Sequence, residues 1–439
     1  MDLALAFLVF AGSMAFVLMH GWSMLIGMVI GFFAFFSVAL HRHFAFKDIA
    51  VMSWKGAKKT LVVLRILLVI GILTGLWRSS GTFAFLVAWG MRLIRPSVFI
   101  LMAYLLSCGM SYAIGTSFGV SGTLGVALMM LARGCGVDLN VTAGAILSGI
   151  YFGDRCSPAS SCAALVASIT DTKIYDNVKL MLKTAFPAVL VSIAFYAWIS
   201  RSNPMASGSV TIVEALENCF NLNPLVALPT VFMLVMPMLG APPLYAFWVS
   251  IACAFACSMF IQGMPFYETL RVAVMGFNAE PGTIKALFHG GGLISMINMC
   301  MIVFISGTYS GIFDGTKMLD SLELGIEHAI NRFGSYLVTA TIGLLSVSIF
   351  CNQSIGSILT SQMLRVPYRN TGRTKDELVQ DMANSVVVFA GLVPWCIGCS
   401  VPLAMLGVSA RAVPFAFYLY ILPATYLLTK KMWFKGKKK

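Results

Sequence analysis

Charged residues are scarce in this chain, and their scarcity excludes a soluble globular protein. Only 11% of its 439 residues are Asp, Glu, Lys or Arg, whereas 59% are hydrophobic and the mean hydropathy is +0.88. A water-soluble fold of this size could not hide so much apolar surface, so most of that surface must face lipid. The composition therefore predicts an all-α membrane protein that crosses the bilayer many times.

Clusters of metal ligands are missing as well. The 11 cysteines are scattered through apolar segments, and the close pair Cys396 and Cys399 has no second pair and no nearby histidine. Thiols in such surroundings behave as small hydrophobic groups rather than as zinc or redox ligands. We predict no cofactor, and Na⁺ or H⁺ as the only bound ions.

Acidic residues are fewer than basic ones, 17 against 30. The basic excess gathers in residues 42–59, 365–375 and 430–439. Basic segments beside membrane spans stay in the cytoplasm and contact anionic lipid headgroups. We therefore predict a bacterial inner-membrane protein with both termini in the cytoplasm and the lipid bilayer, not nucleic acid, as its partner.

The apolar stretches come in two lengths. Long ones such as 3–19, 22–40 and 60–77 suit spans of about 20 residues. Shorter ones are interrupted by Gly, Pro, Ser or Asn and are typical of half-helices or re-entrant hairpins; they are 83–94, 117–132, 141–152, 353–364 and 396–407. Together they predict roughly ten to thirteen membrane segments.

Four regions follow from these stretches. Residues 1–59 are expected to form a helical hairpin with a basic loop, and 60–200 a first transport repeat. Residues 201–289 would supply connecting helices, and 290–439 a second repeat with a basic tail. The mixed polar and apolar segments 262–289 and 320–332 are each predicted to hold a helix at the membrane surface.

Two polar islands interrupt the apolar chain, and they carry the same motifs in the same order. The Ser-Gly-Thr triplets at Ser80 and Ser306 are 226 residues apart, and Gly115 and Gly356 are 241 residues apart. Duplicated polar breaks within membrane segments are typical of secondary transporters built from internal, often inverted, repeats. We therefore predict two such repeats with broken helices, moving by alternating access.

The islands also supply candidate binding residues. A broken membrane helix exposes backbone N–H and C=O groups, which are tolerated only where they line a cavity or meet a ligand. The alternative is that Gly and Ser simply allow helices to pack closely. The candidates are Ser80, Gly81, Thr82, Gly115, Thr116, Ser117, Ser306, Gly307, Thr308, Asn352, Gln353 and Ser354.

Asp154 is the strongest single candidate, because an ionisable residue inside a membrane segment is costly and usually functional. It follows the apolar run 143–152 and precedes Ser157, Ser160 and Ser161, which could add oxygen ligands. A carboxylate there could bind Na⁺ or take up a proton. The alternatives are an ion pair with Arg155 or a position near the membrane surface.

Several of these motifs resemble the NhaC-type Na⁺/H⁺ antiporter family, within the ion-transporter superfamily. The similar segments are 115–119, 143–146, 151–154, 289–296 and 392–395. The resemblance extends from about residue 60 to 420, and it implies inverted repeats, re-entrant hairpins and an elevator-like movement. It also implies coupling to Na⁺ or H⁺.

One motif departs from the family. Its members typically have a Ser-Asp-Thr-Thr-Asn cluster after the Gly-Asp motif, where this chain has Ser160 followed by Ser161, Cys162, Ala163 and Ala164. The loss of a carboxylate weakens an Na⁺ site, because hard cations are selected by the number and charge of oxygen ligands. Asp154 could then face a proton, a weakly held Na⁺ or the ammonium group of an amino acid. We therefore keep two predictions: cation/proton antiport, and coupled transport of a small organic solute such as an amino acid or carboxylate.

Two other classes compete with a carrier. The string from Gly115 to Gly119 matches the GxSxG pattern of serine hydrolases, and His289 precedes three glycines that mimic an oxyanion loop. A nucleophile elbow needs a strand before its helix, which membrane-helix patterning does not supply, so an intramembrane serine protease is a remote alternative and we predict no enzyme. A channel would show large unitary conductance instead of saturable, gradient-dependent flux. A homodimer is compatible with the sequence.

Overall fold

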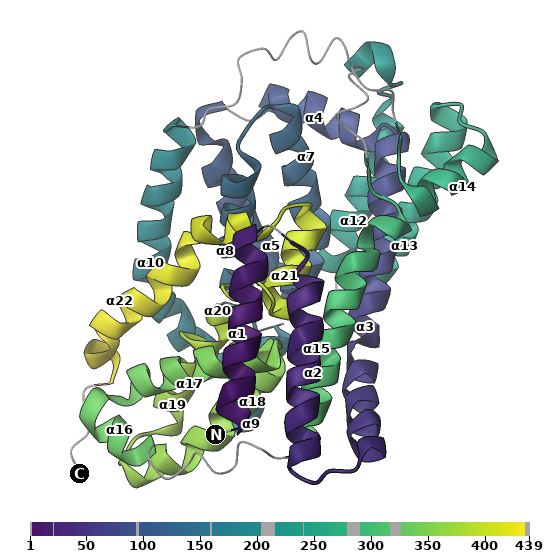
Figure 1. The fold of residues 1–439 in the computed structure, drawn as a ribbon. Helices are drawn as coiled ribbons and strands as arrows, with labels where there is room; N and C mark the ends of the chain where they lie inside the picture. Colours follow the sequence, from purple (N-terminus) through teal and green to yellow (C-terminus); the bar gives the residue numbers. More distant parts are fainter. Residues whose placement is uncertain are drawn as a thin grey trace.

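The helices of this protein stand roughly side by side in one elongated bundle (Figure 1). The computed structural model describes residues 2–20, 22–93, 96–158, 160–202, 216–239, 241–278, 290–316 and 326–434. Within those ranges the structure is helical, apart from an isolated bridge between Phe277 and Gly290, and holds no β-strand. The predicted all-α fold is therefore confirmed, whereas His289 and most of the 201–223 connection lie outside the described residues.

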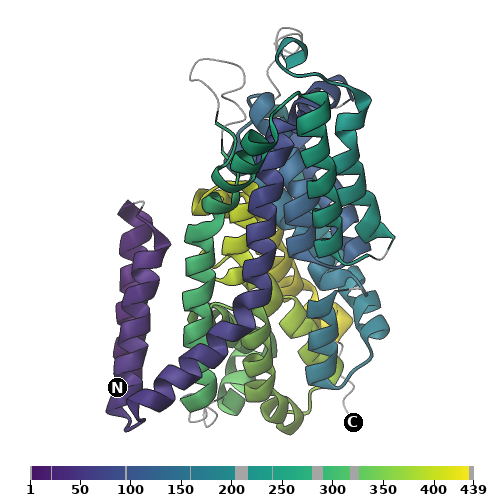
Figure 2. The same ribbon diagram turned by 90° about the vertical axis from the view of Figure 1, so that its right-hand side faces the viewer.

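The N-terminal hairpin consists of α1 (Asp2–His20) and α2 (Met24–His41), and it lies along one side of the molecule (Figure 2). The long helix α3 (Phe46–Ser79) follows it and packs against α15 (Ile297–Thr316). Glycines allow this contact, because a Cβ on Gly56 would lie 2.2 Å from the carbonyl oxygen of Gly307. The two backbones therefore meet directly, as small residues permit in membrane helices.

A second group of helices surrounds the far end of α3. It comprises α4 (Thr82–Leu93), η3 (Pro224–Ala227), α12 (Leu228–Met238), α13 (Pro243–Ala256), the π-turn η4 (Cys257–Ile261), α14 (Phe266–Met275) and η6 (Leu293–Met296). Pro265 directly precedes helix α14, and Glu268 lies in its first turn. The helix carries an apolar face, as an interfacial helix does. Together with α3 and part of α15, these helices enclose one apolar core, called here the scaffold core.

The remaining helices enclose a larger apolar core, called here the transport core. Its first part comprises η1 (Pro96–Val98), α5 (Phe99–Ile114), α6 (Ser117–Val120), the π-turn η2 (Ser121–Gly125), α7 (Val126–Gly134), α8 (Leu139–Cys156), α9 (Ser161–Thr170) and α10 (Ile174–Ser202). Its second part comprises α16 (Ile326–Phe333), α17 (Ser335–Phe350), α18 (Gln353–Asn370), α19 (Lys375–Ala383), α20 (Val386–Phe389), α21 (Ile397–Leu406), η8 (Ala410–Phe415) and α22 (Phe417–Trp433).

Two helix breaks have nearly the same backbone conformation. Gly115 after α5 is left-handed at φ 74°, and Thr116 is extended at φ −143° and ψ 124°. Cys351 after α17 is left-handed at φ 54°, and Asn352 is extended at φ −144° and ψ 124°. In both places the extended residue caps the following helix with its side chain, so each break satisfies its own freed N–H groups.

The structure differs from two predictions about the helix breaks. No break occurs at Ser306, Gly307 and Thr308, because α15 runs through all three residues. The partner of Gly115 is Cys351 rather than Gly356, which lies inside α18. Glycine and serine are tolerated within a helix that packs closely on a neighbour, which is why the triplet did not imply a break there.

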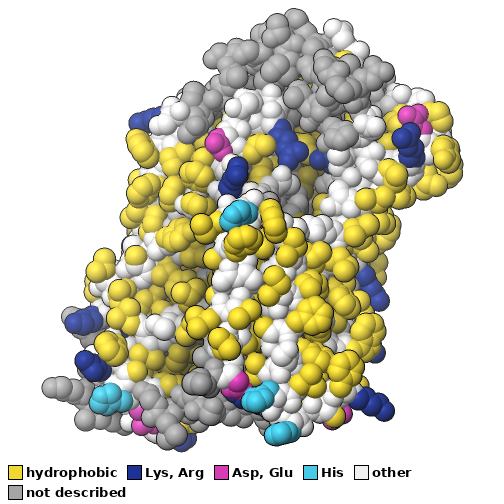
Figure 3. Space-filling model, in the orientation of Figure 1, with side chains coloured by type: hydrophobic (Ala, Val, Ile, Leu, Met, Phe, Trp, Pro, Cys, Tyr) yellow, Lys and Arg dark blue, Asp and Glu magenta, His cyan; other side chains and the backbone are white. Residues whose placement is uncertain are grey.

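The surface and the helix lengths agree with a multi-pass membrane protein. In Figure 3 hydrophobic side chains cover the middle of the visible face, and most charged ones lie toward its two ends. Among the described residues, 5 helices are long and apolar enough to cross a membrane, and further apolar helices of 10–17 residues accompany them. Of the shorter ones, Ile397–Leu406 coincides with the predicted half-helix 396–407, whereas the predicted half-helix 117–132 lies within the 18-residue span Ser117–Gly134.

Candidate functional site

Asp154 lies in the last turn of α8, and its side chain is buried, with 4% of the residue exposed. Its Oδ1 accepts a hydrogen bond from Ser160 Oγ at 3.3 Å, and its Oδ2 accepts one from Gln353 Nε2 at 3.2 Å. Ser160 belongs to the α8–α9 connection and Gln353 begins α18. One carboxylate thus joins two parts of the chain that are 199 residues apart.

The α8–α9 connection holds the serines that follow Asp154. Ser160 caps α9 by accepting from the N–H groups of Cys162 and Ala163, and its hydroxyl also donates to the carbonyl of Asp154. Ser157 is buried, and its own N–H donates to the Gly153 carbonyl. Ser161 is exposed, whereas the Ser160 hydroxyl reaches the carboxylate directly.

The second break supplies Gln353. Its Nε2 also donates to the carbonyl of Val387 on α20 at 3.0 Å, which fixes the amide beside Asp154. Asn352 accepts from the N–H groups of Ser354 and Ile355 and acts as the cap of α18, while Ser354 is exposed. Of the Asn352, Gln353 and Ser354 candidates, Gln353 is the one that reaches the carboxylate.

The first break approaches the same end of α8 from α5. A Cβ added to Gly153 would lie 2.1 Å from the carbonyl carbon of Ser111, so the two backbones touch one turn before Gly115. Thr116 Oγ1 accepts from the Gly119 N–H at 3.3 Å, and Ser117 is buried. Gly115, Thr116 and Ser117 therefore lie at the junction of α5 and α6, two helices that both contact α8.

The Ser-Gly-Thr triplets lie elsewhere. Ser80 and Thr82 share a hydroxyl hydrogen bond of 2.7 Å across Gly81, and the Ser80 carbonyl accepts from Gln262 Nε2. This break separates α3 from α4 and belongs to the scaffold core.

The second triplet mainly packs helices together. Gly307 packs on α3, and Thr308 donates to the carbonyl of its own helix at Ile305. Ser306 alone reaches the second break, where its hydroxyl donates to the Cys351 carbonyl at 3.3 Å.

Arg155 is turned away from Asp154. Its guanidinium donates to the carbonyls of Ala383 and Met181, to Thr184 Oγ1 and to Asn384 Oδ1, at 2.7–3.1 Å. These acceptors are all neutral and belong to α10 and to the α19–α20 region. The alternative of an Asp154–Arg155 ion pair is therefore wrong, and the side chains that donate to the carboxylate among the described residues, Ser160 and Gln353, are neutral.

The sequence analysis missed a second buried acidic centre on α19. Asp381 is fully buried and accepts from Lys430 Nζ at 2.5 Å, Tyr368 at 2.6 Å and Tyr426 at 2.8 Å. Lys430 also pairs with Glu377 at 2.8 Å. Glu377 and Asp381 are four residues apart, so one helix face carries both acids, and this spacing is the signal that could have found them.

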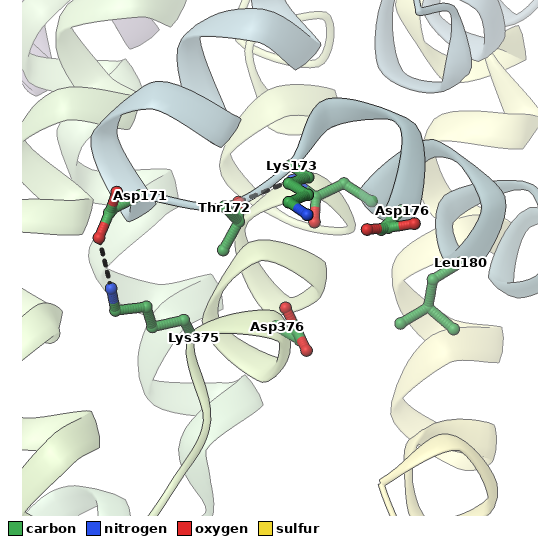
Figure 4. Close-up of a pocket in the computed structure, with 8 residues that line it drawn as sticks. Asp171, Thr172, Lys173, Asp176, Leu180, Lys375 and Asp376 are labelled. Carbon is green, nitrogen blue, oxygen red and sulfur yellow. Dashed lines mark hydrogen bonds and ion pairs between the residues drawn. The ribbon is translucent and has the colours of Figure 1, made fainter.

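A surface cavity of about 580 Å³ lies between the α9–α10 turn and the start of α19. Figure 4 shows Asp171, Lys375, Asp176 and Asp376 around it, with an ion pair between the first two. From its wall a polar chain runs inward: Gln380 donates to the Asn177 carbonyl, Thr184 donates to Gln380, and Arg155 donates to Thr184. The cavity thus connects by hydrogen bonds to the residue beside Asp154.

The chain is similar in sequence to several known antiporters. Relatives include the malate-2H⁺/Na⁺-lactate antiporter of Bacillus subtilis, 25% identical, with 90% of this chain and 86% of that protein covered. The arginine/ornithine antiporter ArcD of Halobacterium salinarum is 28% identical, with 81% of this chain and 74% of that protein covered. The Na⁺/H⁺ antiporter NhaC of Alkalihalophilus pseudofirmus is 25% identical, with 85% and 82% covered.

One sequence-family model covers almost the whole chain. The model of the "Na+/H+ antiporter family" matches residues 3–164 and 149–429. The NhaC-type resemblance is thereby confirmed, and an intramembrane protease is excluded because the family consists of transporters. The chain belongs to the Na⁺/H⁺ antiporter family and is a multi-pass secondary antiporter that uses Na⁺ or H⁺ as a coupled ion.

Proposed function

We propose that the protein exchanges H⁺ for Na⁺, and that both cations bind in turn to the carboxylate of Asp154. The observation that carries this proposal is the isolation of that carboxylate: it is buried, the Ser160 and Gln353 side chains that donate to it are neutral, and Arg155 bonds to other acceptors. A buried anion without a counter-charge is unfavourable until it binds a cation. Competition of two cations for one such site is sufficient for antiport.

The surroundings of Asp154 offer neutral oxygen atoms to a hard cation. They include the Ser160 hydroxyl and the Val387 carbonyl, which already bonds to Gln353. The Tyr151 hydroxyl, one turn earlier on α8, is fully buried and has no hydrogen-bond partner in the described part of the chain. Na⁺ prefers such oxygens, whereas a proton needs only the carboxylate. Ser157, Thr116 and Ser117 on the adjoining elements remain proposed contributors.

Alternating access would arise from movement of the transport core against the scaffold core. The breaks at Gly115 and Cys351, together with Asp154, belong to elements of the transport core, while α3 and α15 are joined through glycines. A rigid body that carries the site past a fixed scaffold is an elevator-like motion. We extend the proposal to two inverted repeats, each with one of the matching breaks.

The orientation follows from charge. The basic loop 42–59 and the C-terminal end both lie at the lower end in Figure 1, so we place this end in the cytoplasm of a bacterial inner membrane. The cavity near Asp171 is then the cytoplasmic approach to the site. Lipid on the apolar belt and a second copy of the chain complete the proposed partners.

The test is proton flux in proteoliposomes with a pH-sensitive dye inside and an imposed Na⁺ gradient. We expect Na⁺-driven proton movement in the wild type, none in Asp154→Asn, and normal movement in Asp48→Asn, whose acid is exposed and lies outside the cavity near Asp171. Flux that persists in Asp154→Asn would refute the role of this carboxylate. Correct folding of each variant is checked by size-exclusion chromatography and thermal unfolding in detergent.

A second candidate function is cation-coupled exchange of a small organic solute. The first turn of α9 supports it, because Cys162 and Ala163 stand near Asp154 and add no second carboxylate to an Na⁺ site. Two relatives are named for organic substrates, malate with lactate and arginine with ornithine. Folded protein without Na⁺-driven proton flux, but with proton flux driven by a carboxylate or amino-acid gradient, would favour this function.

A further inference from the structure

A second cavity, of about 260 Å³, lies between α3, α7, α21 and the glycines before η6. Arg78 from α3 and Arg133 from α7 line it, and Asp154 does not. Helix α7 stands in the upper half of the bundle, opposite the two termini (Figure 1). The same half of Figure 3 shows basic side chains beside a hollow. By the orientation proposed above, this cavity belongs to the external side.

Arg78 is a buried cation with few partners. The residue is 6% exposed, its Nη1 donates to the Thr74 carbonyl at 2.7 Å, and its guanidinium lies 5.3 Å from the centre of the Phe83 ring. Its Nε is buried without a hydrogen-bond partner in the described ranges. A Cβ on Gly291 would lie 2.5 Å from Nη1, so the glycine loop leaves room for the guanidinium.

Arg133 repeats this situation on the opposite wall. Its Nη2 donates to the Gly407 carbonyl at 3.0 Å, and its Nε is likewise buried and unpartnered among the residues described. A Cβ on Gly407 would lie 2.7 Å from Nη2. Both guanidiniums therefore keep free donors beside the cavity, although each also caps the carbonyl end of a helix.

Among the described residues, the cavity wall supplies no negative charge to balance these two cations. None of its lining residues is Asp or Glu, and neither arginine forms an ion pair within the part of the chain that the structure describes. Buried charges are normally paired, and an arginine fork binds a carboxylate through two parallel hydrogen bonds. The rest of the wall is largely apolar, with Val126, Met129, Met130, Met296 and Met405.

We propose that this cavity binds a small organic carboxylate, which Arg78 and Arg133 recognise through its anionic group while the methionine-rich wall contacts its carbon chain. An inorganic anion would leave that apolar wall uncovered. Binding itself is independent of Asp154, whereas its use in transport rests on the second candidate function, the cation-coupled exchange of an organic solute. The carboxylate would be the exchanged solute, met on the external side.

Binding is tested on the purified full-length protein in detergent, by calorimetry with lactate and malate as probes. Lactamide serves as the uncharged control, and chloride and phosphate as inorganic anions. We expect Arg78→Gln and Arg133→Gln each to weaken carboxylate binding about tenfold or more, which is the loss of one charge-assisted hydrogen bond. Arg411→Gln removes an exposed arginine outside this cavity and should leave binding unchanged.

The outcomes separate this site from the Asp154 site. Asp154→Asn should keep carboxylate binding while it loses cation-driven flux, so failure of one proposal does not imply failure of the other. Equal binding of lactamide, or of phosphate and chloride, would overturn the assignment to a carboxylate. So would unchanged carboxylate binding in a folded Arg133→Gln variant, which remains informative if Arg78→Gln does not fold.

Discussion

Asp154 and Asp381 are both buried aspartates of the transport core, yet their partners differ. Asp154 accepts from a hydroxyl and an amide, whereas Asp381 accepts from the Lys430 ammonium and two tyrosine hydroxyls. A carboxylate that already has a buried counter-charge gains little from binding another cation. The comparison supports the proposed cation exchange at Asp154 and predicts a structural role for Asp381.

The arginine beside Asp154 shows how this difference is maintained. Arg155 is sequence-adjacent to the carboxylate, but its guanidinium is occupied by Met181, Thr184, Ala383 and Asn384. These neutral acceptors therefore bind the Arg155 guanidinium, which could otherwise form an ion pair with Asp154. Arg155 is thus next to Asp154 in the sequence, but its hydrogen bonds go to α10 and to the α19–α20 region.

The largest expected effect is on transport by Asp154→Asn. The amide keeps the size of the side chain but cannot bind a cation through a negative charge, so coupled flux should fall to background. Thermal unfolding in detergent should change little, because no ion pair is lost. A large drop in the melting temperature of this variant would instead show that Asp154, like Asp381, stabilises the fold.

Asp381→Asn should show the opposite pattern. It leaves the Lys430 ammonium with Glu377 and the Ser335 hydroxyl as partners, and breaking a buried pair typically costs about 3–5 kcal/mol of unfolding free energy. Flux per folded molecule should persist in protein rescued by low temperature. The double variant Asp381→Leu with Lys430→Met should recover much of the stability, because it removes both charges.

Gly153→Ala tests the contact that positions Asp154. Its Cβ would fall 2.1 Å from a backbone atom of Ser111, so α5 and α8 must separate, at a cost of about 1–3 kcal/mol. Transport and stability should both decline, measured by the flux assay and by thermal unfolding. Gly109→Ala on α5 is the matched control, because its Cβ would meet nothing within 4 Å. Equal loss in both variants would argue against a close-contact role for Gly153.

Much of the Asp154 region could be predicted from sequence because it is encoded locally. Thr116, Asn352 and Ser160 are cap residues directly before apolar helices, and an acid in an apolar segment is visible by composition alone. Gln353 joined the candidates because it stands at such a break. Its contact with Asp154 spans 199 residues and needs the fold.

The spacing of Glu377 and Asp381 marks an acidic helix face in the sequence, but no local pattern gives the tertiary contacts of the Asp381 centre. Lys430 belongs to a basic tail that the positive-inside rule explains by itself, and its partner Asp381 is 49 residues away. The same reasoning failed for Ser306, where glycine beside serine serves helix packing rather than a break. Residue types common to breaks and to packing can be separated only when the neighbouring helix is known.

The smallest expected effect concerns the exposed pair of Asp171 and Lys375, 2.6 Å apart at the cavity beside the start of α19. The hydrogen bond and charge of Lys375 lower the pKa of Asp171 below its ordinary value of 3.8. Stability from this pair is therefore present above that pH and is lost as the pH falls through the lowered pKa. Because solvent and salt screen the pair, Asp171→Asn should barely change the melting temperature at pH 7, and asparagine also accepts the left-handed backbone at φ 56°. A large decrease in the melting temperature of Asp171→Asn, or one that persists in high salt, would contradict this expectation. It would show that an exposed ion pair here stabilises the fold as much as the buried pair of Asp381 and Lys430.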